Sequence, residues 1–301
     1  MRYVMAELLN PRVDYAFKKL FGTEENKAIL IAFINAIVSE DEQIEDVVLL
    51  NPYNHKDRAA DKLSILDIKA TDKRGRRYNI EMQVTDQVSY NQRALYYWSK
   101  LYTSQLTEGK HFGELNKTIS ISILNFNYFD EEDYHNIFHI LNVKSHKNYF
   151  EDLELHFIEL EKFDKDVSHI TTALDRWATF LKKAHEYKKG KLPTTMRDDV
   201  AIVQAMGSLE KMHMSDEELE IYEAQLKWLR DEAGALEKKG IVEYEKGREE
   251  GREEGREEGK EQGIRQRNIE LIKRLEAKGH SIEDIAELTG LSVEGIQKIT
   301  G

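Results

Sequence analysis

The chain has 301 residues, a mass of 35.2 kDa, a formal net charge of −12 and no cysteine. It contains no run of about 18 apolar residues, and its start lacks the basic and then apolar order of a signal peptide, so we expect a cytoplasmic protein without a membrane span. The missing cysteine excludes disulfide bonds, thiol catalysis and cysteine-ligated zinc. Residues 1–110 hold 16 basic and 16 acidic groups, so this segment can still present a basic patch to nucleic-acid phosphates.

The first 160 residues alternate between helical and strand patterns. Apolar spacing predicts two amphipathic helices within residues 10–38, separated at Gly22, and a helix over 89–108 that stops at Gly109. Gly75 predicts a hairpin turn that makes its two flanking strands antiparallel neighbours. The expected strands are 46–53, 62–71, 78–85, 117–129, 136–145 and 152–160. This order is typical of an α/β or α+β domain.

The rest of the chain is helical in pattern, with residues 192–195 as the one clear interruption between 168 and 239. Glycine then recurs every fourth residue over 247–263, in Gly-Arg-Glu-Glu repeats. Internal glycines disfavour a helix by about 1 kcal/mol each. The repeat is therefore either a helix whose glycine ridge packs on a partner helix or a solvated spacer.

Three short amphipathic helices are expected at the end, over 264–279, 281–290 and 291–300. Ser281 and Ser292 are the predicted N-caps, and Asp284 completes a capping box with Ser281. The arrangement is typical of a helix-turn-helix DNA-binding unit, and a small helical oligomerisation module is the alternative.

The candidate chemistry lies in the hairpin. Asp67 interrupts an apolar strand, while Glu81 and Gln83 are two residues apart on the return strand and share a face. If the hairpin brings the three together, two neighbouring buried carboxylates require a compensating cation. Oxygen ligands favour Mg²⁺ or Mn²⁺, which can activate water and neutralise charge on a phosphate. The alternative is a solvent-exposed acidic strand face.

The helix after the hairpin carries Gln92, Arg93 and Tyr96, an amide, a cation and a phenol suited to contacts with a DNA backbone. His135 and His139 have the spacing of a helical zinc site, but their segment has a strand pattern, which would separate the two side chains by about 13 Å. We therefore do not expect a metal site at these histidines.

Several stretches resemble the Rpn family of recombination-promoting nucleases, also described as putative transposases, within the PD-(D/E)XK nuclease superfamily. They are NPRVDYAFKKLFG, LDIKATDKRGRRYNIEMQ, QRALYYWSKLYTSQLTEGKHFGEL and the glycine-periodic tail. The resemblance covers about residues 8–240. It implies a restriction-endonuclease-like core, with a mixed sheet flanked by helices, followed by an all-helical C-terminal region.

The resemblance also implies roles for single residues. Asp67 and Glu81 match the metal-binding acids, and Gln83 stands where the superfamily usually has lysine. A neutral amide can orient the attacking water but lacks the lysine's charge. Asp14 matches an additional acidic metal ligand, and a surface charge paired with Lys18 is its alternative.

We therefore expect an Mg²⁺- or Mn²⁺-dependent DNA endonuclease, linked by resemblance to recombination, mobile elements or phage defence. The alternatives are a catalytically inactive DNA-binding or regulatory protein that self-associates through its C-terminal helices, as a dimer, and an oligomeric scaffold indifferent to DNA. The expected domains are a nuclease-like core (1–165), a helical extension (166–240), the repeat helix or spacer (241–263) and the helix-turn-helix-like tail (264–301).

Overall fold

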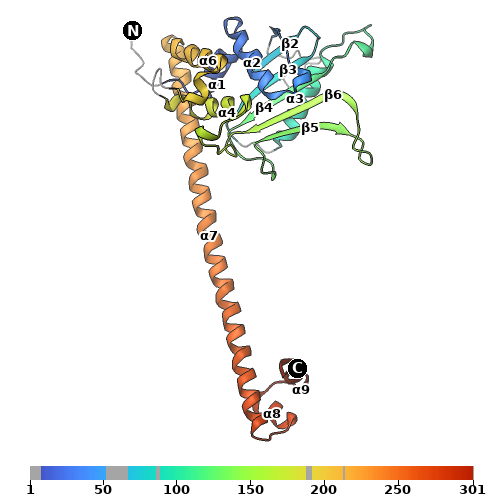
Figure 1. Ribbon diagram of the computed structural model, residues 1–301, viewed down its shortest axis with the longest axis vertical. Helices are drawn as coiled ribbons and strands as arrows, with labels where there is room; N and C mark the ends of the chain where they lie inside the picture. Colours follow the sequence, from blue (N-terminus) through green and yellow to red (C-terminus); the bar gives the residue numbers. More distant parts are fainter. Residues whose placement is uncertain (1–7, 52–66, 86–88, 188–191, 213, 301) are drawn as a thin grey trace. The chain divides into compact units, whose positions relative to one another are not determined.

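The computed structural model describes residues 8–51, 67–85, 89–187, 192–212 and 214–300 (Figure 1). The chain divides into two compact units, Met1–Glu232 and Ala233–Gly301. The boundary falls within helix α7 (Asp216–Ala277). The domain limits expected from the sequence stay predictions.

A mixed six-stranded sheet forms the centre of the first unit. Its strands lie in the order β1-β2-β3-β4-β6-β5. The central pairs β3/β4 and β4/β6 are parallel, and the outer pairs are antiparallel. The strands are β1 (Val47–Leu49), β2 (Ile68–Asp72), β3 (Arg77–Gln83), β4 (Thr118–Leu124), β5 (His135–Leu141) and β6 (Asn148–Glu159).

Helices cover both faces of this sheet, so the central strand β4 is buried along its whole length. Alternate β4 side chains, Ile119, Ile121 and Ile123, join the larger core, to which the helices on one face contribute. The other face packs on α3 (Tyr90–Thr103) through a smaller aromatic core around Tyr90. The helices of the larger core are α1 (Asp14–Phe21), α2 (Lys27–Ile37), α4 (Ala173–Lys183), α5 (Thr194–Arg197), α6 (Val200–Lys211) and the start of α7.

The mixed sheet between helices, with further helices after it, is the predicted fold class. The β2/β3 hairpin is confirmed, and Gly75 has the positive φ of 81° that its turn requires. Several boundaries differ. β2 starts after Asp67, and β6 starts four residues before the expected position 152. β1, β4 and β5 end four or five residues before the expected positions 53, 129 and 145. Residues 62–66 of the expected strand lie outside the described part of the chain.

The second unit contains the remainder of α7, α8 (Ile282–Thr289) and α9 (Val293–Thr300). Three isoleucines, one from each helix, form its small core: Ile272, Ile285 and Ile296. Ser281 caps α8 with the predicted capping box. The expected helix 264–279 is the last part of α7 rather than a separate element.

The Gly-Arg-Glu-Glu repeat also lies within α7, and its residues are exposed. Within the second unit, no atom would come within 4 Å of a Cβ added at any of the five glycines, so neither α8 nor α9 packs on the glycine ridge. None of the described helices combines the length and apolarity needed to span a membrane.

Candidate active site

Asp67 lies just before β2, one position beyond the last residue pair of the hairpin. Ile68 faces Ile80 in the register, so position 67 faces position 81. The Asp67 carboxylate accepts a 3.0 Å hydrogen bond from the backbone N–H of Met82. The Asp67 side chain thus accepts the hydrogen bond that a backbone carbonyl of a longer β2 would have accepted from Met82. This bond fixes the acid against β3.

Glu81 is buried in the middle of β3, with 5 % of its surface exposed. Its strand neighbours Ile80 and Met82 belong to the larger core, so Glu81 faces the α3 side of the sheet. The β4 residue paired with it is Ser122, which is buried as well. Asn79, on the same face, donates a 3.1 Å hydrogen bond to Glu81 Oε1.

The two carboxylates hold their protons more strongly than exposed acids do. Burial, followed by the nearby charge of Asp67, raises the pKa of Glu81 to about 7, although Asn79 and Arg93 act in the opposite direction. Burial also raises the pKa of Asp67, and the cation of Lys18 only partly offsets this effect. The structure therefore brings Asp67 and Glu81 together with too little positive charge.

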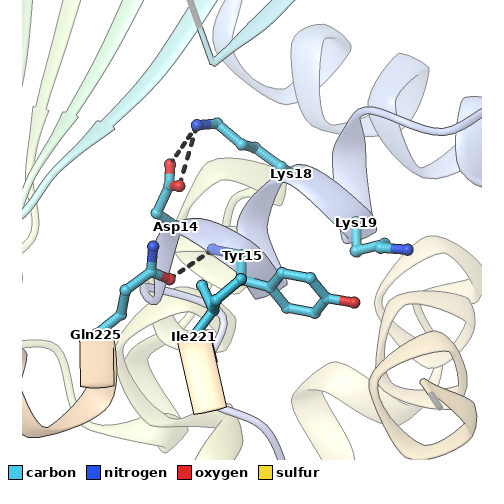
Figure 2. Close-up of a pocket in the computed structure, with 6 residues that line it drawn as sticks. All are labelled: Asp14, Tyr15, Lys18, Lys19, Ile221 and Gln225. Atoms are coloured by element: carbon cyan, nitrogen blue, oxygen red, sulfur yellow. Dashed lines mark hydrogen bonds and ion pairs between the residues drawn. The ribbon is translucent and has the colours of Figure 1, made fainter. Parts of the chain in front are cut away.

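Lys18 on α1 bridges two acids. Its ammonium lies 2.8 Å from Asp14 and 3.4 Å from Asp67. Figure 2 shows the Asp14 carboxylate turned toward Lys18, while Lys19 points away from the pair. Asp14 therefore contacts the site by way of Lys18, which also contacts Asp67. Lys18 is the residue with which the surface-charge interpretation pairs Asp14.

A hollow of about 340 Å³ adjoins the Asp14–Lys18 pair (Figure 2). The first turn of α1 and the side chains of Ile221 and Gln225 on α7 form its walls. Gln225 accepts a 3.1 Å hydrogen bond from the backbone N–H of Tyr15, which fixes this part of α7 to α1. The hollow therefore adjoins Asp14 and Lys18, whereas Asp67 and Glu81 are not among the residues that line it.

Gln83 and Arg93 form a second group next to Glu81. Arg93 donates to Gln83 Oε1, while Gln83 Nε2 donates to the carbonyl of Thr85 at 3.1 Å. The Arg93 guanidinium also lies over two rings, 4.7 Å from the centroid of Tyr90 and 5.8 Å from that of Tyr97. Both ends of the Gln83 amide are thus engaged by the chain, and the amide holds a cation close to Glu81.

Gln92, Arg93 and Tyr96, the three α3 residues expected to contact DNA, do not lie along one line of the helix surface. Arg93 reaches Gln83, and one turn later burial, followed by the charge of Glu81, raises the pKa of Tyr97. Gln92 is exposed and Tyr96 is half-buried on the neighbouring stripe. Their expected contacts with DNA stay predictions.

Sequence reasoning paired Lys18 with Asp14 but missed its contact with Asp67, and it missed Asn79 and Tyr97 as neighbours of the acids. Tyr97 follows Arg93 at helical spacing, and Asn79 precedes Glu81 by two strand residues, so both could have been found from periodicity. The contact of Lys18 with Asp67 could not, because only the packing of α1 beside the end of β2 brings the two together.

The predicted strand at His135 and His139 is confirmed as β5. His135 Nε2 lies 2.9 Å from His156 Nδ1, and burial, together with the charge of His156, lowers the pKa of His135 to about 4. His156 Nε2 in turn lies 2.7 Å from Glu154 Oε1. These histidines belong to a buried polar chain that crosses the sheet.

The residues at the acid pair fit an oxygen-ligated divalent cation. Within the described chain no three acidic or histidine side chains converge as a complete metal cage. Mg²⁺, however, is commonly held by one or two carboxylates, with water and substrate phosphates as its other ligands. The buried Asn79 Oδ1 accepts no hydrogen bond from the described residues. It is therefore a further oxygen atom available to a cation, next to two carboxylates that have too little positive charge around them.

Comparison with protein families gives a match to the PD-(D/E)XK nuclease family transposase model over residues 11–239. Neither a comparison with curated proteins nor one with solved structures gives a match. The matched range contains the hairpin, both acids and α3. The chain belongs to the PD-(D/E)XK nuclease family transposases.

Proposed function

We propose that the protein is a divalent-metal-dependent DNA endonuclease and that Asp67 and Glu81 hold its Mg²⁺ or Mn²⁺. The observation that carries this proposal is the buried, fixed carboxylate pair whose pKa values are raised. A cation bound there would neutralise charge on the scissile phosphate and lower the pKa of a water molecule. Family membership supports a nuclease-like or transposase-related role.

The chain's own residues position the reacting groups. The N–H of Met82 holds Asp67, and Asn79 holds Glu81, so neither acid needs to reorganise when the site binds its ligands. Lys18 and Arg93 provide positive charge on the two sides of the acids. We assign to them the charge that lysine would have given at the position of Gln83. Gln83 itself acts by holding Arg93.

Plasmid nicking tests the catalytic assignment. Supercoiled plasmid is incubated with the wild type, Asp67→Asn and Glu81→Gln, each with Mg²⁺, Mn²⁺ or EDTA, and with Glu108→Gln as a control that removes an exposed acid after α3. We expect nicking by the wild type and the control only with metal, and a loss of about a hundredfold or more in both site variants. Nicking that survives in both variants would refute the assignment.

Metal binding has its own readout. Because the ligands must lose protons, Mn²⁺ should raise the melting temperature of the wild type more at pH 8 than at pH 6, on the two sides of the Glu81 pKa of about 7. Glu81→Gln should lose most of the shift. A shift without nicking, together with DNA retardation in a gel, would instead support the inactive DNA-binding alternative.

The biological setting is part of the proposal and rests on the family alone. We propose a role in DNA recombination, mobile-element movement or phage defence. Removal of residues 264–301 tests whether the C-terminal helices add DNA affinity or self-association. DNA retardation that is unchanged by the truncation, with an unchanged oligomeric mass, would exclude both roles.

A further inference from the structure

One edge of the sheet is long and open. Among the described residues, β5 pairs with β6 alone and forms the outer strand of the sheet (Figure 1). Both register shifts insert their extra residues in β6, since Phe138 faces Leu155 and Ile140 faces Phe150. β5 itself is therefore continuous, and every second residue directs its backbone N–H and C=O away from the sheet.

The opposite edge lacks these properties. β1 has three residues, whereas β5 has seven. Edge strands are usually protected by shortness, by charged side chains or by proline. The sequence of β5, HNIFHIL, contains no lysine, arginine, acidic residue or proline. Of the two edges that the described strands form, the β5 edge alone therefore offers a full strand for pairing.

Exposed apolar side chains surround this edge. Ile137, Ile140 and Leu141 on β5 are 43–50 % exposed, and Val143 in the turn is 88 % exposed. On the paired strand, Tyr149 and Phe150 are about two-thirds exposed. Isolated apolar residues are common on protein surfaces, but several of them along one open edge are typical of an interface.

The charges at the two ends of β5 determine what fits. Four exposed acids, residues 130–133, precede the strand and are separated from it by Tyr134, and the exposed Lys144, His146 and Lys147 come after it. A second copy running antiparallel places the acidic end of each strand against the basic end of the other, twice per pair. A parallel copy would place like charges together. The edge is therefore complementary to itself in one orientation.

We propose that two copies of this chain pair through β5, antiparallel and about a two-fold axis, so that their sheets join. The proposal does not depend on nuclease activity, and it differs from self-association through the C-terminal helices. Glu132 lies three residues before β5 and Lys144 three residues after it, so an antiparallel pair centred on Phe138 would bring these two positions near each other at the ends of the interface.

Cross-linking of the full chain tests this geometry directly, because the protein has no cysteine. Glu132→Cys and Lys144→Cys are mixed in equal amounts and treated with a short bis-maleimide. The control is Lys73→Cys, in the turn between β2 and β3, which is also exposed. We expect a mixed cross-linked dimer several-fold more abundant than with any single variant. Yields no higher than the control's, or equal yields from each variant alone, would overturn the proposal.

Charge reversal gives a second test. Glu132→Lys and Lys144→Glu each place like charges opposite one another twice, so each should weaken dimerisation by about threefold or more in sedimentation equilibrium. The double variant should restore the wild-type value. Both sites are exposed, and circular dichroism checks that the fold is intact. Single and double variants that all associate like the wild type would contradict pairing through β5.

Discussion

The sheet carries two buried ionic groups that differ in charge balance. On the α3 side, Asp67 and Glu81 have raised pKa values. On the opposite face, burial alone would raise the pKa of Glu154, but hydrogen bonds from His156 and Lys117 lower it to about 2. Buried carboxylates therefore belong to a charge-balanced network on one face of the sheet. On the other face they form a pair with too little positive charge.

The second group is a chain of alternating charges. Lys117 lies 2.7 Å from Glu154 and 2.9 Å from Glu42, and Arg76 joins Glu42 to Asp72. Each carboxylate thus has a cation from the same chain. The difference teaches that buried acids by themselves do not indicate a site, whereas buried acids short of cations do.

The largest expected effect comes from breaking the balanced group. Lys117→Met removes the ammonium that the half-buried Glu42 and the buried Glu154 share and leaves Glu154 under-compensated, so we expect a loss of about 3–5 kcal/mol in the free energy of unfolding. Urea denaturation at pH 7 measures it. The control Lys110→Met breaks an exposed pair with Glu114 and should change stability by less than about 0.5 kcal/mol. Equal values for the two variants would refute the comparison.

A gain is expected from the unbalanced group. The pKa of Glu81 rises from 4.5 unfolded to about 7 folded, so the folded state binds the proton more tightly and wild-type stability falls between these two values as pH rises. Without metal, Glu81→Gln should therefore be more stable than the wild type by on the order of 3 kcal/mol at pH 8, with little difference at pH 4. Denaturation at both pH values checks this. A gain that is independent of pH would contradict it.

The smallest expected effect comes from Lys18, whose ammonium lies between Asp14 and Asp67. Lys18 is 39 % exposed, so Lys18→Met should lower stability by no more than about 1 kcal/mol. It should also raise the pKa values of Asp67 and Glu81 and shift pH-dependent Mn²⁺ binding to higher pH. Lys19→Met is the matched control, because Lys19 pairs instead with Glu218 at 3.2 Å. A binding curve that is the same for both variants would exclude a role for Lys18.

Local signals in the sequence were sufficient for much of the fold. Gly75 specified the hairpin, and the Ser281 capping box specified the start of α8, because both depend on neighbouring residues alone. Pairing between distant strands was not predictable in this way. The parallel placement of β4 between β3 and β6 depends on burial of both faces of TISISIL, which periodicity alone does not assign to partners.

The same limit applies to the site. The juxtaposition of Asp67 and Glu81 follows from the hairpin register, which the sequence makes accessible. The charge balance around them does not, because Lys18 arrives from α1 and Arg93 is held by Gln83. A lysine in the usual position would have been visible in the sequence, whereas cations supplied by two helices require the tertiary structure.

The glycine spacing in α7 has a consequence for any partner of that helix. Four helical residues turn by about 400°, so each glycine lies about 40° further around the axis than the one before. From Gly247 to Gly263 the line of glycines rises by about 24 Å and winds through about 160°. A straight partner helix could face only one or two of these glycines at a time, and contact with all five would require a partner that coils around α7.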